Sequence, residues 1–151
     1  IDRLSKKGDP DYIDFPKPMI DSGDFNFSFS GLKTSLIYRT KKNRKLMADS
    51  NIPSLAASFQ NSIVEVLTEK TIGACRKLNV KNVLVSGGVA ANSRLRQEFA
   101  RKGAENKIKI FIPPVYLCMD NAAMVACLGY SKYLKGKFDS LETDVYSRSD
   151  I

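Results

Sequence analysis

A glycine loop between an apolar run and a helical pattern is the first feature of the sequence that could do chemistry. The apolar run 83–85, with two β-branched valines, leads directly into Ser86, Gly87 and Gly88. Adjacent glycines let a backbone approach a ligand closely, and the free N–H groups at a helix start favour a phosphate or another anion. The loop lacks both the P-loop lysine and the dinucleotide-fingerprint spacing, so a tight structural turn is the alternative interpretation.

Two polar side chains lie near predicted helix starts. Asn92 falls about one turn into the helix after the glycine loop, where its amide could face a ligand or simply water. Asp120 precedes an apolar helix and is typical of an N-cap, although its carboxylate could instead be one ligand of a hard or borderline cation. Cys118 lies close by, but a free cysteine is more often a small buried hydrophobic residue. The residues alone leave these alternatives open.

The 151 residues include no histidine. This absence excludes Ser-His-Asp and Cys-His nucleophile arrangements, histidine acid–base catalysis and imidazole metal sites built from this chain alone. Any chemistry here must therefore use carboxylates, amides, lysines or backbone groups.

The composition is that of an ordinary globular domain with an excess of positive charge. Hydrophobic residues make up 43% of the chain and charged residues 26%, and 24 Lys+Arg against 16 Asp+Glu give a net charge of +8. Such a balance favours a polyanionic partner. The densest basic cluster is Lys41, Lys42, Arg44 and Lys45, and such a run is more often a solvated loop than a binding site.

The cysteines and the apolar runs indicate where the protein works. Cys75, Cys118 and Cys127 show no CxxC spacing, which argues against a disulfide framework or a zinc cluster and favours a reducing, cytoplasmic setting. No apolar run reaches the roughly 20 residues needed to cross a bilayer, and no signal peptide is recognisable. The chain begins with Ile1, so we expect a fragment or a processed piece.

The periodicity of apolar residues predicts an α/β fold with helices covering a sheet. Residues 1–24 are predicted to be an extended arm or inter-lobe segment without a helix, and residues 25–151 an α/β lobe. Within the lobe the pattern predicts strands at 25–29, 83–85 and 108–112. It predicts helices at 32–42, from Pro53 to 78, at 90–102 and at 120–135.

Three runs together resemble the C-terminal half of a known family. They are FSFSGLKT at 27–34, SGGVAANSRLR at 86–96 and CMDNAAM at 118–124. Their order and content are similar to those of the tRNA N6-adenosine threonylcarbamoyltransferases of the TsaD type, formerly described as O-sialoglycoprotein endopeptidases. The resemblance covers nearly the whole chain.

The resemblance implies a ribonuclease-H-like lobe of the actin-like, sugar-kinase and heat-shock-ATPase fold, with the ligand held between two lobes. It implies that Asn92, Gly87 and Gly88 contact the nucleotide part of the substrate. Asp2 resembles the end of a nucleoside-binding GGPxID run, although the preceding glycines are absent. Asp120 would be one ligand of a divalent metal, most readily iron, with zinc as the alternative. The family's N-terminal lobe, which supplies two histidines to that metal, has no counterpart here.

The implied activity is transfer of a threonylcarbamoyl group from threonylcarbamoyl-adenylate to N6 of the adenosine next to the tRNA anticodon. The metal would act as a Lewis acid on the acyl donor, and tRNA, the missing lobe and other subunits of a threonylcarbamoylation complex would be partners, without a membrane. We expect this chain to be inactive alone. The alternative function is a non-catalytic nucleotide- or partner-binding module. A peptidase is poorly supported, because the chain has no HExxH run and no nucleophile–base pair.

Overall fold

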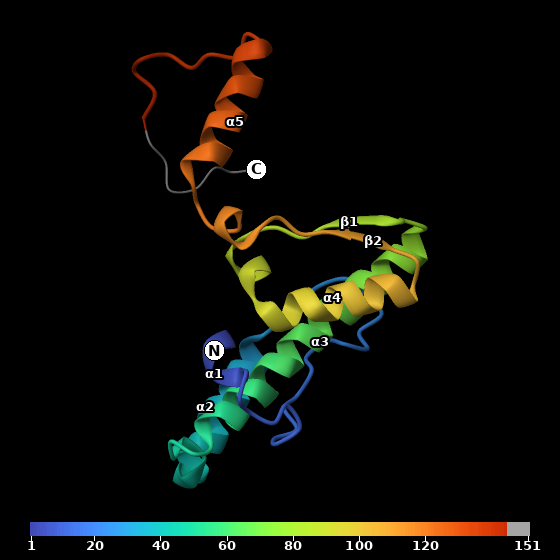
Figure 1. Ribbon diagram of the computed structural model, residues 1–151, viewed down its shortest axis with the longest axis vertical. Coiled ribbons are helices and arrows are strands. Elements are labelled where there is room, and N and C mark those ends of the chain that lie inside the picture. The colour runs from blue at the N-terminus through green and yellow to red at the C-terminus, as the bar shows by residue number, and fades with distance from the viewer. Residues whose placement is uncertain (145–151) are drawn as a thin grey trace.

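The computed structural model describes residues 1–144 and is organised around one long helix, α3 (Ile52–Leu78) (Figure 1). Pro53 stands in its first turn, where a missing backbone N–H costs nothing. Asn79 ends it in a left-handed conformation, and the N–H of Val80 donates to the Cys75 carbonyl at 2.9 Å. The predicted helix from Pro53 to 78 is confirmed.

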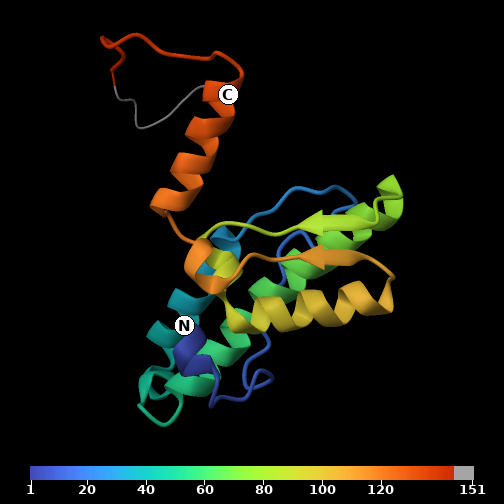
Figure 2. The same cartoon turned by 45° about the horizontal axis from the view of Figure 1, so that its top comes forward.

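A β–α–β unit lies along one side of α3 (Figure 2). Strand β1 (Asn82–Leu84), helix α4 (Ser93–Glu105) and strand β2 (Lys109–Phe111) follow one another, and the two strands pair in parallel with Val83 opposite Ile110. Apolar side chains of α3, α4 and the strands form two buried clusters, centred on Val64, Leu95 and Phe99 and on Ile72, Cys75 and Ile108. This packing fixes where the glycine loop between β1 and α4 lies.

The other face of this sheet is open among the described residues. Leu84 is 75% exposed and Phe111 44% exposed, although parallel strands are usually covered on both faces. The described part of the chain holds two strands in one sheet, so it combines helices with a small parallel sheet and is compatible with an α/β fold. Helix α5 (Ala122–Leu134) extends away from α3 and α4 (Figures 1 and 2).

The N-terminal third packs against the first half of α3. Helix α1 (Asp2–Ser5) contacts α3, while α2 (Ser30–Lys42) and the 3₁₀ helix η1 (Arg44–Met47) follow a long loop. Phe15 from that loop, Leu32 and Leu55 form a third buried cluster. No helix among residues 1–144 is long and apolar enough to span a membrane.

Several local predictions need correction. The segment 25–29 is not a strand, because no strand among residues 1–144 lies beside it and the Asn26 carbonyl accepts a hydrogen bond from the Lys70 ammonium instead. The arm predicted to lack helix contains α1, one turn closed by the Ser5 N–H bond to the Ile1 carbonyl. The helix predicted from residue 90 begins with the 3₁₀ helix η2 (Gly88–Ala91) and becomes α-helical only at Ser93. The boundary at residue 24 stays a prediction.

Candidate functional site

The glycine loop connects the end of β1 to α4. Gly87 has φ 90°, a conformation that side chains rarely adopt, so glycine is required there. The Ala90 N–H donates to the Gly87 carbonyl at 2.9 Å and closes η2. A Cβ at Gly88 would meet open space, so the loop presents its backbone outward rather than packing it inside.

Asn92 caps α4 instead of lying inside it. Its Oδ1 accepts from the Leu95 N–H at 2.9 Å, and its Nδ2 donates to Oε1 of Gln60 on α3 at 2.7 Å. Gln60 in turn donates from Nε2 to the Ser5 hydroxyl at 2.8 Å. The sequence placed Asn92 one turn too deep because it missed the 3₁₀ start. Its amide is oriented by α3, with both heteroatoms already engaged.

Asp2 reaches the same helix start from the other end of the chain. Its Oδ1 accepts from the Ser93 hydroxyl at 2.7 Å and from the Ser93 N–H at 3.2 Å. A carboxylate at a helix N-terminus is favoured by the partial positive charge there. The structure therefore brings Asp2 beside Asn92 at the start of α4, whereas Gly87 and Gly88 lie at the other end of η2. We call the hydrogen-bonded set Asp2, Ser5, Gln60, Asn92 and Ser93 the α4 cap network.

A small cavity lies against this network. It measures about 170 Å³, and its lining includes Gln60, Asn92 and the apolar side chains of Ile1 and Val89. Ligand pockets commonly have volumes of about 300–1,000 Å³. This cavity is therefore smaller than a typical ligand pocket.

Arg96 connects the segment 113–118, which follows β2, to the end of the glycine loop. From α4 its guanidinium donates to the Ala90 carbonyl at 2.7 Å, to the Pro113 carbonyl, and to Sγ of Cys118 at 3.2 Å. Sequence reasoning assigned Arg96 no role, since an arginine on a helix surface is ordinarily solvated. The planar, forked guanidinium suits this bridging of several acceptors.

Asp120 lies outside the α4 cap network. It is exposed, and Asn121, not Asp120, caps α5 by accepting from the Met124 N–H at 2.9 Å. Residues 1–144 contain no group of three His, Cys, Asp or Glu side chains that could hold a metal, and the Cys118 thiol is buried against proline carbonyls. These residues alone do not fit a metal ion, because Asp120 supplies a single carboxylate.

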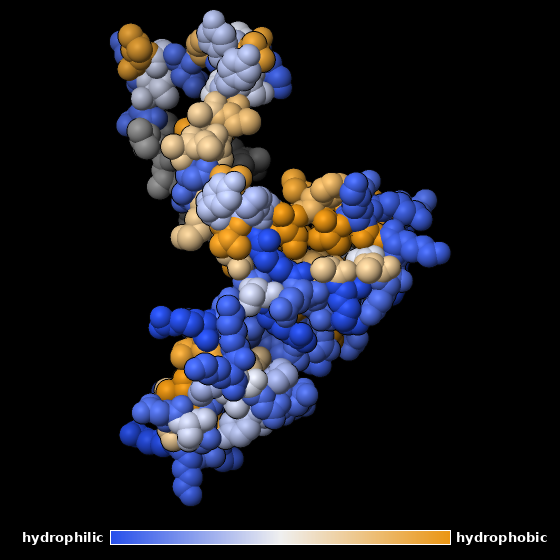
Figure 3. Space-filling view, in the orientation of Figure 1, coloured by the Kyte–Doolittle hydropathy of each residue, from blue (hydrophilic) through white to orange (hydrophobic). Residues whose placement is uncertain are grey.

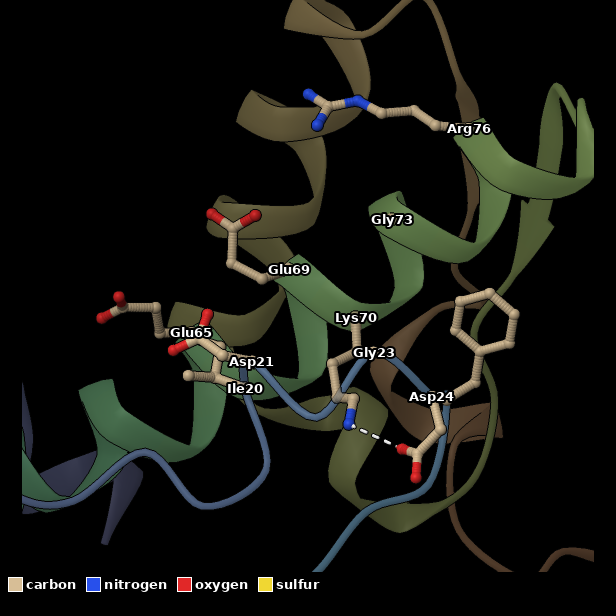
Figure 4. Close-up of a pocket in the computed structure, with 10 residues that line it drawn as sticks. Ile20, Asp21, Gly23, Asp24, Glu65, Glu69, Lys70, Gly73 and Arg76 are labelled. Atoms are coloured by element: carbon tan, nitrogen blue, oxygen red, sulfur yellow. Dashed lines mark hydrogen bonds and ion pairs between the residues drawn. The ribbon is translucent and has the colours of Figure 1, made fainter.

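A larger cavity, of about 440 Å³, lies on the opposite flank of α3 beside the loop 20–25 (Figure 4). There Lys70, which is 6% exposed, donates from Nζ to the carbonyls of Met19 (2.6 Å) and Asn26 (2.7 Å) and to the Ser22 hydroxyl (2.8 Å). Asp24 Oδ1 lies 3.3 Å from the same ammonium.

Hydrogen bonds from Ser22, from Asn26 and from Lys70 lower the pKa of Asp24 to about 2. Sequence reasoning missed this cluster, although Lys70 falls on the apolar stripe of α3 and that position was a signal.

Comparisons with known proteins identify the family. The model of the tRNA N6-adenosine threonylcarbamoyltransferases (TsaD) matches residues 1–127. The chain belongs to the tRNA N6-adenosine threonylcarbamoyltransferase family. It is 49% identical over 138 residues to the threonylcarbamoyltransferase of Thermosipho africanus, covering 90% of this chain and 41% of that protein.

Other members of the family show the same partial coverage. The Syntrophus aciditrophicus threonylcarbamoyltransferase is 47% identical over 98% of this chain and 43% of its own length. The Staphylococcus aureus threonylcarbamoyltransferase is 42% identical over 100% of this chain and 44% of its own length. The chain therefore spans less than half the length of the threonylcarbamoyltransferases that it matches.

Proposed function

We propose that this chain is the C-terminal part of an enzyme that transfers a threonylcarbamoyl group from threonylcarbamoyl-adenylate to N6 of the adenosine adjacent to the tRNA anticodon. The family match over residues 1–127 is the observation that carries the proposal. Because the relatives are more than twice as long, we propose that the chain is inactive without an N-terminal lobe.

Within that reaction, the glycine loop and the α4 cap network would position the adenylate. Backbone groups at Gly87 and Gly88 suit an approach to phosphate. The N-terminus of α4 is already engaged by the Asp2 carboxylate and by Asn92. Asp2 and Asn92 would act from fixed orientations, because Ser93 and Gln60 hold them. The small adjoining cavity supports a pocket that the proposed N-terminal lobe would complete.

We also propose that a divalent metal, iron or zinc, binds at a site to which this chain contributes only part of the ligands. Asp120 would supply one ligand, and the others would come from outside the described residues. When bound, such a metal would supply Lewis-acid stabilisation of the acyl donor. The residues of this chain support no further step through it.

The surroundings of the reaction are proposed on the same basis. We assign the chain to a lobe of the actin-like, sugar-kinase and heat-shock-ATPase fold, with tRNA and other subunits of a threonylcarbamoylation complex as partners. A cytoplasmic location is consistent with three free cysteines.

Nucleotide binding by this chain tests the site. In ligand-observed NMR titrations we expect AMP to bind weakly and Asn92→Ser to weaken binding at least tenfold. Serine keeps a cap acceptor for α4 but removes the amide held by Gln60. Asp2→Asn, which removes only the charge, tests the second residue in the same way.

Asn121→Ser is the matched control, because Asn121 caps α5 through the same kind of bond away from the α4 cap network. It should leave AMP binding unchanged. Equal binding by the wild-type chain and by Asn92→Ser and Asp2→Asn would contradict the proposed site. Binding of tRNA with no AMP binding at all would favour the non-catalytic module.

A further inference from the structure

The excess positive charge of the chain is concentrated in one short segment. Between Ser30 and Ala48 the sequence has six lysines and arginines and no aspartate or glutamate. The remaining 132 residues carry 18 basic and 16 acidic side chains, which nearly cancel. Six of the eight net positive charges therefore lie on α2 and η1.

Five of these cations form what we call the basic tip, namely Arg39, Lys41, Lys42, Arg44 and Lys45. All five are exposed, at the end of the molecule opposite α5, where hydrophilic side chains predominate (Figures 1 and 3). None takes part in an ion pair among residues 1–144, whereas basic side chains elsewhere, such as Arg101 and Lys102, are paired with glutamates. The charge of the basic tip is not neutralised by the described part of the chain.

The backbone of the basic tip is held in place by the fold. Asn43 caps the turn by accepting from the Lys45 N–H at 3.2 Å, and Asn51 Nδ2 donates to the Lys45 carbonyl at 2.9 Å. Leu46 packs against the buried cluster of Phe15, Leu32 and Leu55. The cations thus project from fixed positions instead of from a free loop, which lowers the entropy lost on binding.

Helix capping accounts for only part of this cluster. Cations in the last turn of α2 interact favourably with the helix dipole, which explains Arg39, Lys41 and Lys42. Arg44 and Lys45 lie beyond the cap residue Asn43, where that effect ends. Their presence without acidic partners points to an external anion.

An exposed aromatic ring lies among the cations. Tyr38 is 63% exposed, and the Lys42 ammonium lies 5.9 Å from its ring centroid. Cations that neutralise phosphates beside an aromatic surface on which bases can stack are a combination used for RNA.

We propose that the basic tip binds the phosphate backbone of tRNA, away from the adenosine that reacts. This inference rests on the proposed function for the identity of the RNA. Along α3, nine residues or about 13 Å of helix rise separate Asn51 at the basic tip from Gln60 in the α4 cap network. A macromolecular substrate can span that separation, and binding energy from its remote parts would hold the reacting base at the site.

The salt dependence of tRNA binding tests the inference. The quadruple variant Lys41→Gln, Lys42→Gln, Arg44→Gln and Lys45→Gln should bind tRNA at least tenfold more weakly at about 0.1 M salt. The plot of log K against log[salt] has a negative slope, and each lost phosphate contact reduces the magnitude of that slope by about 0.7–0.9. Four lost contacts therefore make the slope less steep by about 3. Fluorescence anisotropy with labelled tRNA measures both quantities, and circular dichroism confirms that the variant is folded.

The matched control removes the same charge elsewhere. Lys81, Lys109, Lys132 and Lys135 are exposed and lie outside the basic tip, and their quadruple glutamine variant should bind tRNA within threefold of wild type. Equal losses in the two quadruple variants, or no loss in either, would overturn the inference. So would a basic-tip variant that loses affinity for phosphatidylserine vesicles while keeping its affinity for tRNA.

Failure of the proposed function has a different signature. Asn92→Ser leaves the basic tip intact and should bind tRNA like the wild-type chain. Absence of AMP binding with tRNA binding that still depends on the basic tip would refute the proposed adenylate site and support the basic tip.

Discussion

Replacing the ammonium of Lys70 tests how the loop 19–26 is held on α3. Lys70→Met keeps most of the aliphatic stem of a side chain that is 3% exposed. It removes the ammonium group, which donates to two backbone carbonyls and a hydroxyl. Hydrogen bonds to charged groups contribute roughly 1.5–3 kcal/mol each, but water can reach the loop acceptors once the ammonium is gone. We therefore expect the free energy of unfolding to fall by about 3 kcal/mol, which is less than the sum of the separate bonds.

Urea unfolding followed by circular dichroism measures that loss, and hydrogen exchange locates it. Relative to the wild-type chain, the Lys70→Met variant should show faster exchange at the amides of the loop 19–26, with little change at the amides of α4. The control is Lys17→Met, because Lys17, just before this loop, is attached to α3 through one partly exposed ion pair with Glu65 at 2.7 Å. Such a pair contributes less than about 1 kcal/mol. Losses of similar size in the two variants would refute the reasoning that burial and multiple acceptors make Lys70 the principal anchor.

Two further predictions concern packing and pH. Gly103→Ala should lower the free energy of unfolding by about 1–3 kcal/mol in urea titrations, because a Cβ there would lie 2.9 Å from the Ile108 carbonyl and 2.6 Å from the Ile110 side chain. An unchanged urea midpoint in Gly103→Ala would contradict this, because it would show that β2 can shift to accommodate the added methyl group without loss of stability. The pKa of Asp24 is lowered from 3.8 to about 2, so its contribution to stability is complete above about pH 4 and is lost as the pH falls toward 2. Asp24→Asn should abolish that part of the acid dependence, and an identical acid profile in the variant would contradict it.

Much of the fold was predictable because its signals are local. The apolar stripe of α3 repeats at helical spacing, and the two apolar runs that flank α4 identify a β–α–β unit. Strand β1 has the three residues that were predicted, shifted by one position, whereas β2 has three residues where five were predicted.

The strand predicted from the aromatic alternation at 25–29 was wrong. Alternation indicates which side of the backbone each ring lies on, but not whether a neighbouring strand is available for pairing. The rings of Phe27 and Phe29 do stack on one side, at 6.4 Å between centroids. The backbone directly before Phe27 is held by Lys70, which donates to the Asn26 carbonyl, instead of by a sheet.

The sequence identified the candidate residues but not the hydrogen bonds that they make. Gly87 was recognisable because its role depends on its own backbone. Asn92 was identified without its cap role, since the 3₁₀ turn before α4 has no apolar period. Asp120 was taken as near an N-cap, and the cap is its neighbour Asn121.

The sequence by itself determined the absence of histidine chemistry, the long helix α3, the β–α–β order around α4 and the concentration of charge between residues 30 and 48. Only the tertiary structure decided that Asp2 meets Ser93, 91 residues away, that Gln60 orients Asn92, and that Lys70 is buried. The physical reason is the range of the forces involved. Periodicity and backbone preference act between neighbours in the chain, whereas these contacts exist only after α1, α3 and α4 have packed against one another.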